Sequence, residues 1–395
     1  MISVTNKTKC CGCTACVNIC PKKCIIMKQD NEGFQYPHVD IERCINCRLC
    51  DKSCPILNKR KINKELNAVA VQNKEKNTLY HSAAGGAFSA IATVTIENGG
   101  VVYGAAYDEN MVVRHKLACT IDELNEFRSS KYVQSDLGNV YVDVEKKLQQ
   151  GKEVCFSGTP CQVAGLKNYL KKEYSSLVTV DLVCKGVGSP EVLRQYVELQ
   201  EKKYKSTIIG MNFKRKTYGY HSSTMSVDFN NGKSYSCGGI TDPMMRSFRA
   251  NICLRPSCSE CSFKGRHRES DLTIFDCWHY SELTGKKDDD RGHTAVLIHS
   301  EKGKQRIQQC GELLKVDKIN PDEVIELDGI MVEHCVTNHK KRDAYMRILE
   351  SEGLERAIEE CIPITSIDRY KEASKEILYR IGLLSLVKSV GVKRK

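Results

Sequence analysis

The sequence has no long hydrophobic run. Its longest apolar stretch lies between Ile381 and Val387, is interrupted by a glycine and a serine, and is far shorter than the ~20 residues needed to span a bilayer. The segment from Met1 to Cys16 is polar and cysteine-rich and lacks the apolar core of a secretory signal. We therefore expect a cytoplasmic protein.

A G-x-G-x-x-G motif after a strand is also missing, which leaves a conventional dinucleotide-binding fold unsupported. Hydrophobic residues make up 41% of the 395 residues and charged residues 28%, so the composition excludes wholesale disorder. A chain of this length accommodates two or three domains, at ~100–200 residues each.

Cysteine is the residue present in excess. The chain has 22 cysteines, and ten of them lie within the first 54 residues. A cytosolic protein keeps its thiols reduced, so this number indicates metal or redox chemistry rather than disulfides.

The amino-terminal cysteines form an internal repeat. Two quartets of the form C-x2-C-x2-C-x3-C-P begin at Cys10 and Cys44 and are closed by Pro21 and Pro55. This is the bacterial two-cluster ferredoxin pattern, in which the fourth cysteine of each quartet binds the other cluster. The pattern predicts two [4Fe–4S] clusters, the first held by Cys10, Cys13, Cys16 and Cys54, and the second by Cys44, Cys47, Cys50 and Cys20.

Paired zinc knuckles or a disulfide framework are the alternatives for these quartets, but zinc needs no duplicated triple-plus-proline arrangement. Two cysteines fall outside the pattern. We expect Cys24 to be a small core residue beside a cluster and Cys11 to be a neighbour of Cys10. Between the quartets, the segment from Asp30 to Gly33 is typical of a hairpin turn.

The net charge of +11 counts every cysteine as neutral. Two clusters of about −2 each lower it to about +7, and three clusters to about +5. The last 25 residues alone supply five net positive charges. We therefore predict no nucleic-acid surface.

The body of the chain follows a polar, basic linker at residues 59–67 and alternates strands with helices. Two consecutive strand–helix segments carry Cys161 and Cys184 just after their strands. In parallel sheets with right-handed crossovers the strand ends meet at one edge, so both thiols can reach one cluster. The Cys258-x2-Cys261 pair follows an expected antiparallel hairpin that turns at residues 230–232.

We therefore predict a third [4Fe–4S] cluster held by Cys161, Cys184, Cys258 and Cys261. Buried structural cysteines and a zinc site are the alternatives, and Cys253 and Cys277 are rival ligands.

Clusters exchange single electrons, whereas a flavin converts between hydride and one-electron chemistry. Two small-residue turns before helices, at residues 82–86 and 157–159, are suited to flavin phosphates, because helix N-termini offer free N–H groups. Ordinary helix caps are the alternative interpretation of both turns.

Six segments of the chain resemble the coenzyme F420 hydrogenase/dehydrogenase beta-subunit family, many bacterial members of which carry the same amino-terminal ferredoxin fusion. The segments are Gly85–Ala92, Gly99–Asp108, Ser129–Ser135, Ser157–Leu166, Val180–Pro190 and Leu254–Gly265. The resemblance spans roughly residues 1–300, and the GTPCQ sequence after Ser157 is its most specific element.

This resemblance implies a flavin- and iron–sulfur-dependent oxidoreductase in which FAD exchanges hydride with a carrier such as coenzyme F420. It places Cys161, Cys184, Cys258 and Cys261 at cluster-associated positions. The segments that it places around FAD contain Gly85, Gly86, Ser130, Lys131, Tyr132, Gln134, Ser157, Gly158 and Thr159. For Lys131 and Tyr132, an exposed basic loop is the alternative.

The chain departs from the family at Ala83-Ala84, at Lys185 and at Cys277, which puts the hydride carrier in doubt more than the cofactors. Relatives also occur in organisms without F420, often beside polysaccharide-biosynthesis genes. The predicted partners are a redox protein (a ferredoxin or a hydrogenase or reductase subunit) and a hydride-carrying small molecule. An electron-transfer subunit that is silent without its partner is the alternative function.

Catalytic acid–base residues are not identified. His221, His267, His279 and His293 are candidates for which a structural role is favoured, and Arg266 to Arg268 form a basic cluster suited to an anionic substrate or to a solvated face. A helix from Ile377 to Val392 would carry Ile377, Ile381, Leu384 and Val387 along one stripe, for packing or for peripheral membrane contact.

The predicted fold class is α+β: a bacterial-type two-cluster ferredoxin domain followed by a larger mixed α/β domain that binds flavin and a cluster. The expected boundaries are 1–58 for the ferredoxin domain, 59–67 for the linker, 68–345 for the larger domain and 346–395 for a helical, basic amphipathic tail.

Overall fold

The computed structural model describes residues 1–60, 62 and 66–384. Residues 61 and 63–65 of the linker expected at residues 59–67, and the last part of the tail, therefore lie outside the described residues. Contacts divide the chain into two compact units, and each is described by itself. The first comprises Met1–Glu191 and Leu254–Thr337, and the second comprises Val192–Cys253 and the chain from Asn338 onward.

The ferredoxin segment repeats its local structure as it repeats its sequence. Each quartet wraps into a short helix, α1 (Ala15–Asn18) and α2 (Leu49–Ser53), preceded by a residue in the left-handed conformation, Thr14 at φ 61° and Arg48 at φ 57°. Between them, β1 (Ile25–Gln29) and β2 (Gln35–Val39) pair antiparallel around the expected turn.

The core of the first unit is an eight-stranded sheet in the described residues, with strand order β13-β3-β12-β11-β7-β6-β4-β5. The strands are β3 (Asn67–Asn73), β4 (Val101–Tyr107), β5 (Val113–Ala118), β6 (Val154–Ser157), β7 (Leu177–Leu182), β11 (Leu272–Asp276), β12 (Thr294–Ile298) and β13 (Leu314–Ile319).

The central strands run in the parallel arrangement that the sequence predicts. Strands β4, β6, β7 and β11 pair parallel, and β12 runs antiparallel between β11 and β3, which gives β3 the direction of the parallel strands. The carboxyl ends of these five strands therefore meet at one edge of the sheet, where ligand sites of such folds lie.

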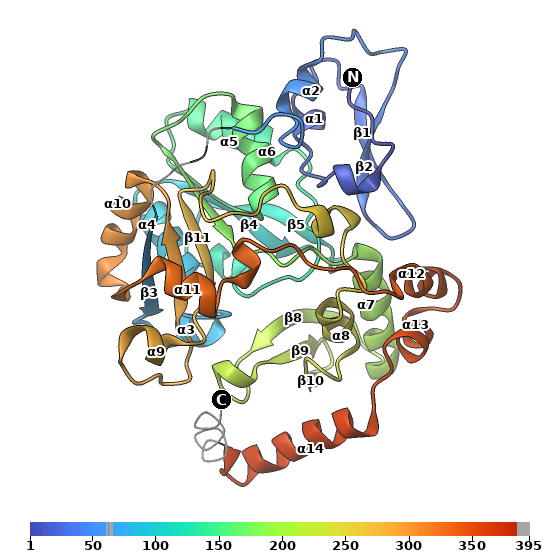
Figure 1. Cartoon of the computed structure of the whole chain (residues 1–395), viewed down its shortest axis with the longest axis vertical. Helices are drawn as coiled ribbons and strands as arrows, with labels where there is room; N and C mark the ends of the chain where they lie inside the picture. Colours follow the sequence, from blue (N-terminus) through green and yellow to red (C-terminus); the bar gives the residue numbers. More distant parts are fainter. Residues whose placement is uncertain (61, 63–65, 385–395) are drawn as a thin grey trace. The chain divides into compact units, whose positions relative to one another are not determined.

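Helices cover both faces of this sheet (Figure 1). One face packs on α4 (Ala87–Glu97) and α10 (Glu301–Gln309). The other packs on α5 (Val140–Gln149), α6 (Pro160–Leu170), α9 (Tyr280–Thr284) and α11 (Pro321–Leu327). Helix α3 (Lys76–His81) follows β3. The structure is thus the predicted α+β fold, with a ferredoxin-like domain and a larger mixed α/β domain.

The ferredoxin segment shares the core of the larger domain. Cys13 and Ala15 are buried with side chains of α5 and α6, and Figure 1 shows α1 and α2 beside these helices. Gly165 of α6 lies directly against Cys13, because an added Cβ at Gly165 would come 2.9 Å from the Cβ and 3.0 Å from the Sγ of Cys13. This close approach joins the first cysteine quartet to α6.

The second unit is built on a three-stranded antiparallel sheet, β10-β9-β8, in which the predicted hairpin connects β9 and β10. Its elements are β8 (Ile208–Arg215), β9 (Thr224–Phe229), β10 (Ser234–Gly238), α7 (Pro190–Tyr204), α8 (Pro243–Arg249), α12 (Arg342–Ser351), α13 (Leu354–Cys361) and α14 (Ser366–Arg380). Helix α7 begins at Pro190, with its first two residues in the first unit.

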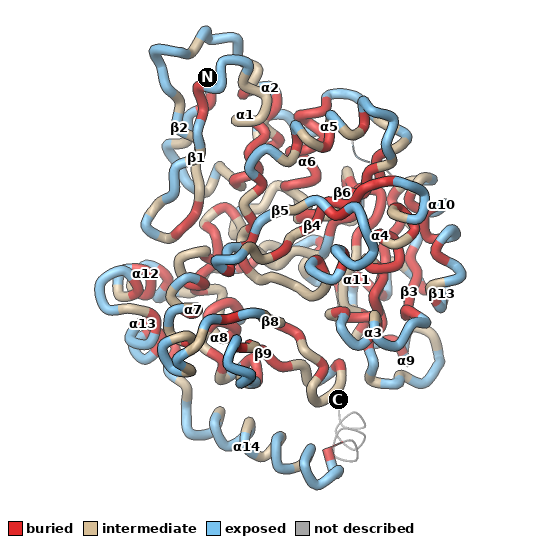
Figure 2. The backbone as a smooth tube through the Cα atoms, turned by 180° about the vertical axis from the view of Figure 1, so that it is seen from behind, coloured by how far each residue is buried: buried red, intermediate tan, exposed pale blue. Residues whose placement is uncertain are grey.

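The carboxyl-terminal helix differs from its prediction. Helix α14 begins at Ser366 and ends at Arg380, because Gly382 adopts φ 71° and stops it. None of its side chains is buried, as Figure 2 shows, and Ile377 and Ile381 are each 58% exposed. The expectation of a continuous helix from Ile377 to Val392 is thus wrong at Gly382, and residues 385–395, with Val387, lie outside the described residues. Among the described helices, each is too short or too polar to cross a membrane.

Candidate iron–sulfur and flavin site

The cysteines expected to hold the second cluster line one cavity. Cys20, Cys44, Cys47 and Cys50 surround a solvent-connected space of about 370 Å³ at the end of the ferredoxin hairpin. Cys24 also borders it and is buried, with its Sγ 3.4 Å from that of Cys20. Four thiols from both quartets therefore face one space, the donor set that a [4Fe–4S] cluster takes.

The cysteines expected to hold the first cluster are also close together. Burial, and after it the neighbouring thiols of Cys10 and Cys54, raise the pKa of Cys16 to about 12. Burial likewise raises the pKa of Cys54, to which Cys10 contributes. Thiols that raise one another's pKa in this way ionise together only when a metal compensates their charge.

A separate cavity gathers the four cysteines from the body of the chain. We call it the third cavity, after the third predicted cluster. Cys161, Cys184, Cys258 and Cys261 line a space of about 580 Å³ in the first unit. Cys161 lies in the first turn of α6, and Cys184 follows β7. Cys258 lies in the 3-10 helix η4 (Pro256–Glu260), and Cys261 caps that helix. The sheet edge thus brings together the four side chains that the sequence singles out.

The rival ligands lie elsewhere. Cys277 is fully buried in the core beneath α9 and α11, with Ala295 and Leu297, and Cys253 is fully buried in the second unit. Within the part of the chain that the structure describes, neither residue borders the third cavity. Both are buried core residues away from the third cavity.

The third cavity is electrostatically suited to a metal cluster. Burial, and after it the thiols of Cys258 and Cys161, raise the pKa of Cys184 well above its usual range, and burial raises that of Cys258 to about 12. The N-terminus of α6 faces Cys161, where a helix dipole favours a thiolate. Lys264 donates from Nζ to the carbonyl of Cys184 at 2.7 Å and fixes that loop.

A fifth cysteine reaches this cavity. Cys11 lines it together with the four, and a hydrogen bond with Cys11, followed by burial, raises the pKa of Cys161. The sequence gives no sign of this, because Cys11 lies next to Cys10 and meets Cys161 only when the ferredoxin segment docks on α6. Cys11 therefore lies between the first quartet and the third cavity.

The Ser157–Thr159 turn, expected beside FAD, is held rigidly at the carboxyl end of β6. His115 Nε2 lies 2.9 Å from the carbonyl oxygen of Ser157, and its Nδ1 lies 2.9 Å from Ser135 Oγ. Gln162 accepts from the backbone N–H of Thr159 at 2.9 Å and donates to Ser135 Oγ at 2.9 Å. The turn and Cys161 are thus positioned by one buried network.

The Ser130–Gln134 loop precedes Ser135 of this network and contacts the ferredoxin segment through Gln134. Gln134 donates to the carbonyl oxygen of Cys11 at 3.4 Å. Lys131 donates to the carbonyl oxygens of Glu126 and Arg128, and burial lowers its pKa to about 7. Ser130 and Tyr132 are half-buried on the same loop. Lys131 is therefore held by backbone carbonyls, unlike a freely solvated basic loop.

Gly85 and Gly86 lie farther along the sheet edge, at β3 and β12. The N–H of Gly85 donates to Thr294 Oγ1 at 2.8 Å, and its carbonyl accepts from Asn73 at 2.7 Å. Gly86 is the N-cap of α4. Strand β3 is four strand spacings from β6, about 19 Å at the usual separation. A ligand that reaches both turns must be elongated.

The histidine and arginine candidates are engaged in pairs. His279 Nδ1 lies 2.6 Å from Asp328, and Arg266 pairs with Asp322 and Glu333. Arg268 is buried, 3.5 Å from Asp181. His267 is exposed, and His221 belongs to the second unit. The expected basic cluster at residues 266–268 is therefore divided between separate ion pairs.

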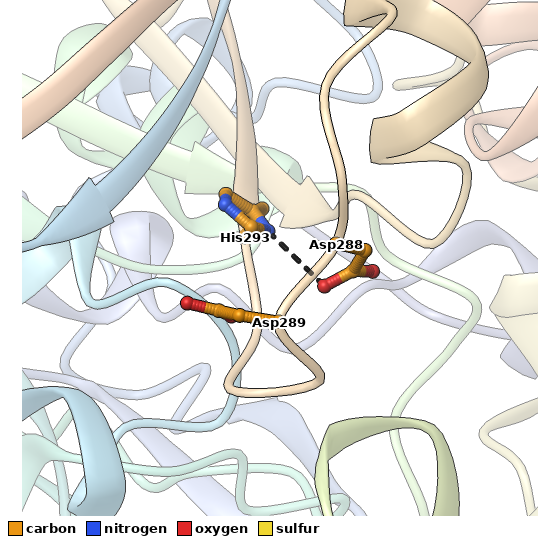
Figure 3. Close-up of side chains that lie close together, drawn as sticks. All are labelled: Asp288, Asp289 and His293. Atoms are coloured by element: carbon orange, nitrogen blue, oxygen red, sulfur yellow. Dashed lines mark ion pairs between the residues drawn. The ribbon is translucent and has the colours of Figure 1, made fainter. Parts of the chain in front are cut away.

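His293 lies with two acidic residues at the sheet edge (Figure 3). Its Nδ1 is 3.7 Å from Asp288, and its ring stacks on Tyr280 at 3.5 Å. Asp288, Asp289 and His293 offer ligand atoms within 4.8 Å of one another. Asp289 already pairs with Arg291 and accepts from Gln72 at 3.0 Å, so one of the three candidate ligands is engaged by the protein.

Comparisons with known proteins agree with this arrangement. Residues 151–323 match the family model for the carboxyl terminus of the coenzyme F420 hydrogenase/dehydrogenase beta subunit, and this match includes the Cys161 turn and the Cys258–Cys261 pair. Residues 9–57 match the 4Fe-4S dicluster domain. Over residues 151–323 the chain is thus similar to the coenzyme F420 hydrogenase/dehydrogenase beta-subunit family. Its amino-terminal domain is of the type that binds [4Fe–4S] clusters.

Among curated proteins, an uncharacterised ferredoxin of Methanocaldococcus jannaschii is 38% identical over 52 residues, which are 13% of this chain and 66% of that ferredoxin. The chain thus spans slightly less than two thirds of this relative's length. Among solved structures, the xenon-derivatised F420-reducing [NiFe] hydrogenase complex of Methanosarcina barkeri contains a similar chain. It has 15% identity and a TM-score of 0.42, with 76% of this chain and 93% of that chain covered.

Proposed function

We propose that this protein is an iron–sulfur flavoprotein oxidoreductase that passes electrons between a hydride carrier and a ferredoxin-type redox protein. One FAD and three [4Fe–4S] clusters would carry the electrons, the two of the ferredoxin domain and a third held by Cys161, Cys184, Cys258 and Cys261. The observation that carries the proposal is the third cavity, in which these four cysteines meet beside the ferredoxin domain and at the carboxyl edge of the sheet.

The order of the cysteine sites supports an electron path. Cys47 of the second quartet is exposed, which suits exchange with a partner protein. In the predicted ligand pattern, the fourth cysteine of each quartet binds the cluster of the other quartet. Cys13 of the first quartet packs against α6, whose first turn carries Cys161. Each site is therefore next to the following one, and the third is the closest to the sheet edge.

The residues at the edge fit an elongated flavin. The Ser157–Thr159 turn begins α6 and the Gly85–Gly86 turn begins α4, so each presents a helix N-terminus along the same edge. The amine of Lys131 lies on the loop that precedes Ser135 and is held by the carbonyl oxygens of Glu126 and Arg128. A bound flavin would supply the exchange of a hydride for two single electrons.

The hydride carrier is the open part of the proposal. Coenzyme F420 is the carrier that the family name indicates. The alternative is a ferredoxin-dependent reductase or electron-transfer subunit that acts with other subunits in polysaccharide or cell-envelope biosynthesis. The departures at Lys185 and Cys277 lie near the cavity or in the adjacent core and are compatible with a different carrier.

Iron and flavin analysis of protein purified without oxygen tests the cofactors. About twelve irons and one FAD per chain support the proposal, whereas about eight irons and no flavin favour an electron-transfer subunit with the ferredoxin clusters alone. C161S should lose about four irons, while C253S, the matched control at a buried cysteine outside the cavity, should lose none. Protein that takes up zinc in place of iron would contradict the proposal.

The carrier is tested by bleaching of the visible cluster absorption under anoxic conditions with reduced F420 or NAD(P)H as separate donors. Bleaching by reduced F420 identifies the family carrier. If neither donor reduces protein with full iron and flavin content, the alternative acceptor function gains support.

A further inference from the structure

Arg255 is the largest fully buried side chain of the described residues and is not part of any predicted site. It follows β-bridge residue Leu254 and precedes η4, so it shares a loop with Cys258. Its backbone N–H donates to the carbonyl of Val187 at 2.9 Å, and its carbonyl accepts from Cys258 at 3.0 Å. The side chain lines the third cavity and is fixed at its base.

The guanidinium group of Arg255 reaches from this cavity into the ferredoxin domain. Nε donates to the carbonyl oxygen of Cys10 at 2.9 Å, and Nη2 donates to that of Gln35 at 3.0 Å. Nη1 donates to Gln134 Oε1 at 2.6 Å, and the group lies 4.3 Å above the ring of Tyr36. Every hydrogen-bond acceptor is thus neutral.

A buried cation without an anion is costly, because burial removes its hydration. The other buried arginines of the described residues each pair with a carboxylate: Arg268 with Asp181, Arg306 with Glu153 and Arg342 with Asp343. In the described part of the chain, no carboxylate lies within ion-pair distance of Arg255. Its compensating negative charge must come from another source.

The surrounding thiols identify that source. Arg255 lines the third cavity together with Cys161 and Cys258 on one side, and its Nε donates to the carbonyl oxygen of Cys10 on the other. Two of the three expected clusters therefore flank one guanidinium, and each carries about two negative charges when oxidised and about three when reduced.

From this geometry we infer that Arg255 is the countercation shared by the first and third clusters, and that it keeps their reduction potentials close to each other. A buried positive charge stabilises the reduced, more negative state of each cluster. Because one group acts on both, it raises the two potentials together and keeps the step between them small. Arg255 is a positioning residue, and the inference rests on the proposed function, since it requires both clusters.

The test is a redox titration of anoxic protein, monitored by electron paramagnetic resonance, in the wild type, R255Q and R255K. R255Q removes the charge, so we expect at least a tenfold lower ratio of reduced to oxidised cluster at a fixed applied potential, about 59 mV for a one-electron couple. The first and third clusters should both shift to more negative potentials. R255K keeps the charge and should stay near the wild type.

R306Q is the matched control, because it removes a buried guanidinium that is already paired with Glu153. It should leave every cluster potential unchanged. If R255Q keeps its iron but shifts neither cluster, or if R255K shifts as far as R255Q, the inference is overturned, because the charge then has no role.

Should R255Q fail to hold its iron, R255K decides. R255K with full iron and a wild-type potential supports the charge role, and R255K that also loses iron overturns it. A wild-type protein with about eight irons would instead refute the third cluster of the proposed function. In that case the shared role fails together with the third cluster, whereas a protein with about twelve irons whose potentials do not shift in R255Q refutes the inference alone.

Discussion

Gly165 of α6 lies directly against Cys13 of the ferredoxin domain. A Cβ added at Gly165 would come 2.8 Å from the Tyr141 hydroxyl and 2.9 Å from the Cys13 Cβ. No other residue type fits at this position without a shift. The first cluster loop and the helix that begins at Cys161 are therefore in direct contact. The contact is one structural connection between the two predicted cluster sites, beside those made by Cys11 and Arg255.

Gly165→Ala should weaken this contact. Alanine is the better helix former by about 1 kcal/mol, but overpacking of a tight core typically costs about 1–3 kcal/mol. We expect a lower apparent melting temperature and slower transfer of electrons from the ferredoxin clusters to the third, measured by anoxic stopped-flow absorption. Gly311→Ala is the matched control, because an added Cβ there meets no atom within 4 Å. Equal effects of the two substitutions would contradict this interpretation.

Cys11 and Cys161 border the same cavity, yet we expect them to respond differently to substitution. C161S should lose about four irons per chain, because a [4Fe–4S] cluster requires its ligands. C11S should keep the full iron content, since the four predicted ligands remain. Iron analysis and the visible spectrum measure both outcomes. Loss of iron in C11S alone would make Cys11 a ligand and Cys161 its neighbour.

Gln162 holds the turn that positions Cys161. Gln162→Leu would leave the Thr159 N–H without its partner and remove one bond to Ser135. An unsatisfied buried donor costs about 1–3 kcal/mol, so thermal stability and retention of the third cluster should both fall. Gln308→Leu on the exposed face of α10 is the control and should change neither. A stable Q162L protein with full iron content would show that the turn is held by other contacts.

The buried His115 makes stability depend on pH. Burial lowers its pKa to about 4, from an unfolded value of about 6.5. Between these pH values the unfolded chain binds more protons than the folded chain. The free energy of unfolding is therefore unaffected by His115 above about pH 6.5 and decreases as the pH falls toward 4. Asp136 opposes this shift and Lys131 adds to it, as smaller effects.

His115→Gln should remove this dependence. We expect the stability of the wild type relative to H115Q to fall by about 3 kcal/mol between pH 7 and pH 4. Apparent melting temperatures at several pH values, recorded without oxygen at one scan rate, measure the difference. Parallel pH profiles for the two proteins would contradict a neutral, buried His115.

Patterns that repeat along the chain were readable from the sequence. The quartet spacing predicted the ferredoxin domain, and the position of Cys161 and Cys184 after their strands predicted their meeting, because parallel strand ends share an edge. The antiparallel insertion of β12 between β3 and β11 was not predictable, because nothing local in Thr294–Ile298 selects its neighbours.

Cys11 and Arg255 escaped prediction for a different reason. Their partners lie on segments far away in sequence, Cys161 for the first and Cys10 for the second, and only docking of the ferredoxin domain creates these contacts. A single arginine before a C-x2-C pair gives no signal of a buried cation. The predicted helix from Ile377 to Val392 lies too far toward the carboxyl terminus, because its apolar stripe crosses Gly382. Helix α14 ends before this glycine.

The pairing of β3 with β12 and β13 has a consequence for biosynthesis. The first strand of the large sheet must wait for residues 294–319 to leave the ribosome, whereas both ferredoxin quartets are available from the start. Iron delivery to the amino terminus can therefore precede closure of the sheet, and the Cys161–Cys261 cavity matures last. A translation arrest before β12 should yield a nascent chain that already binds iron yet has no place for the final cubane.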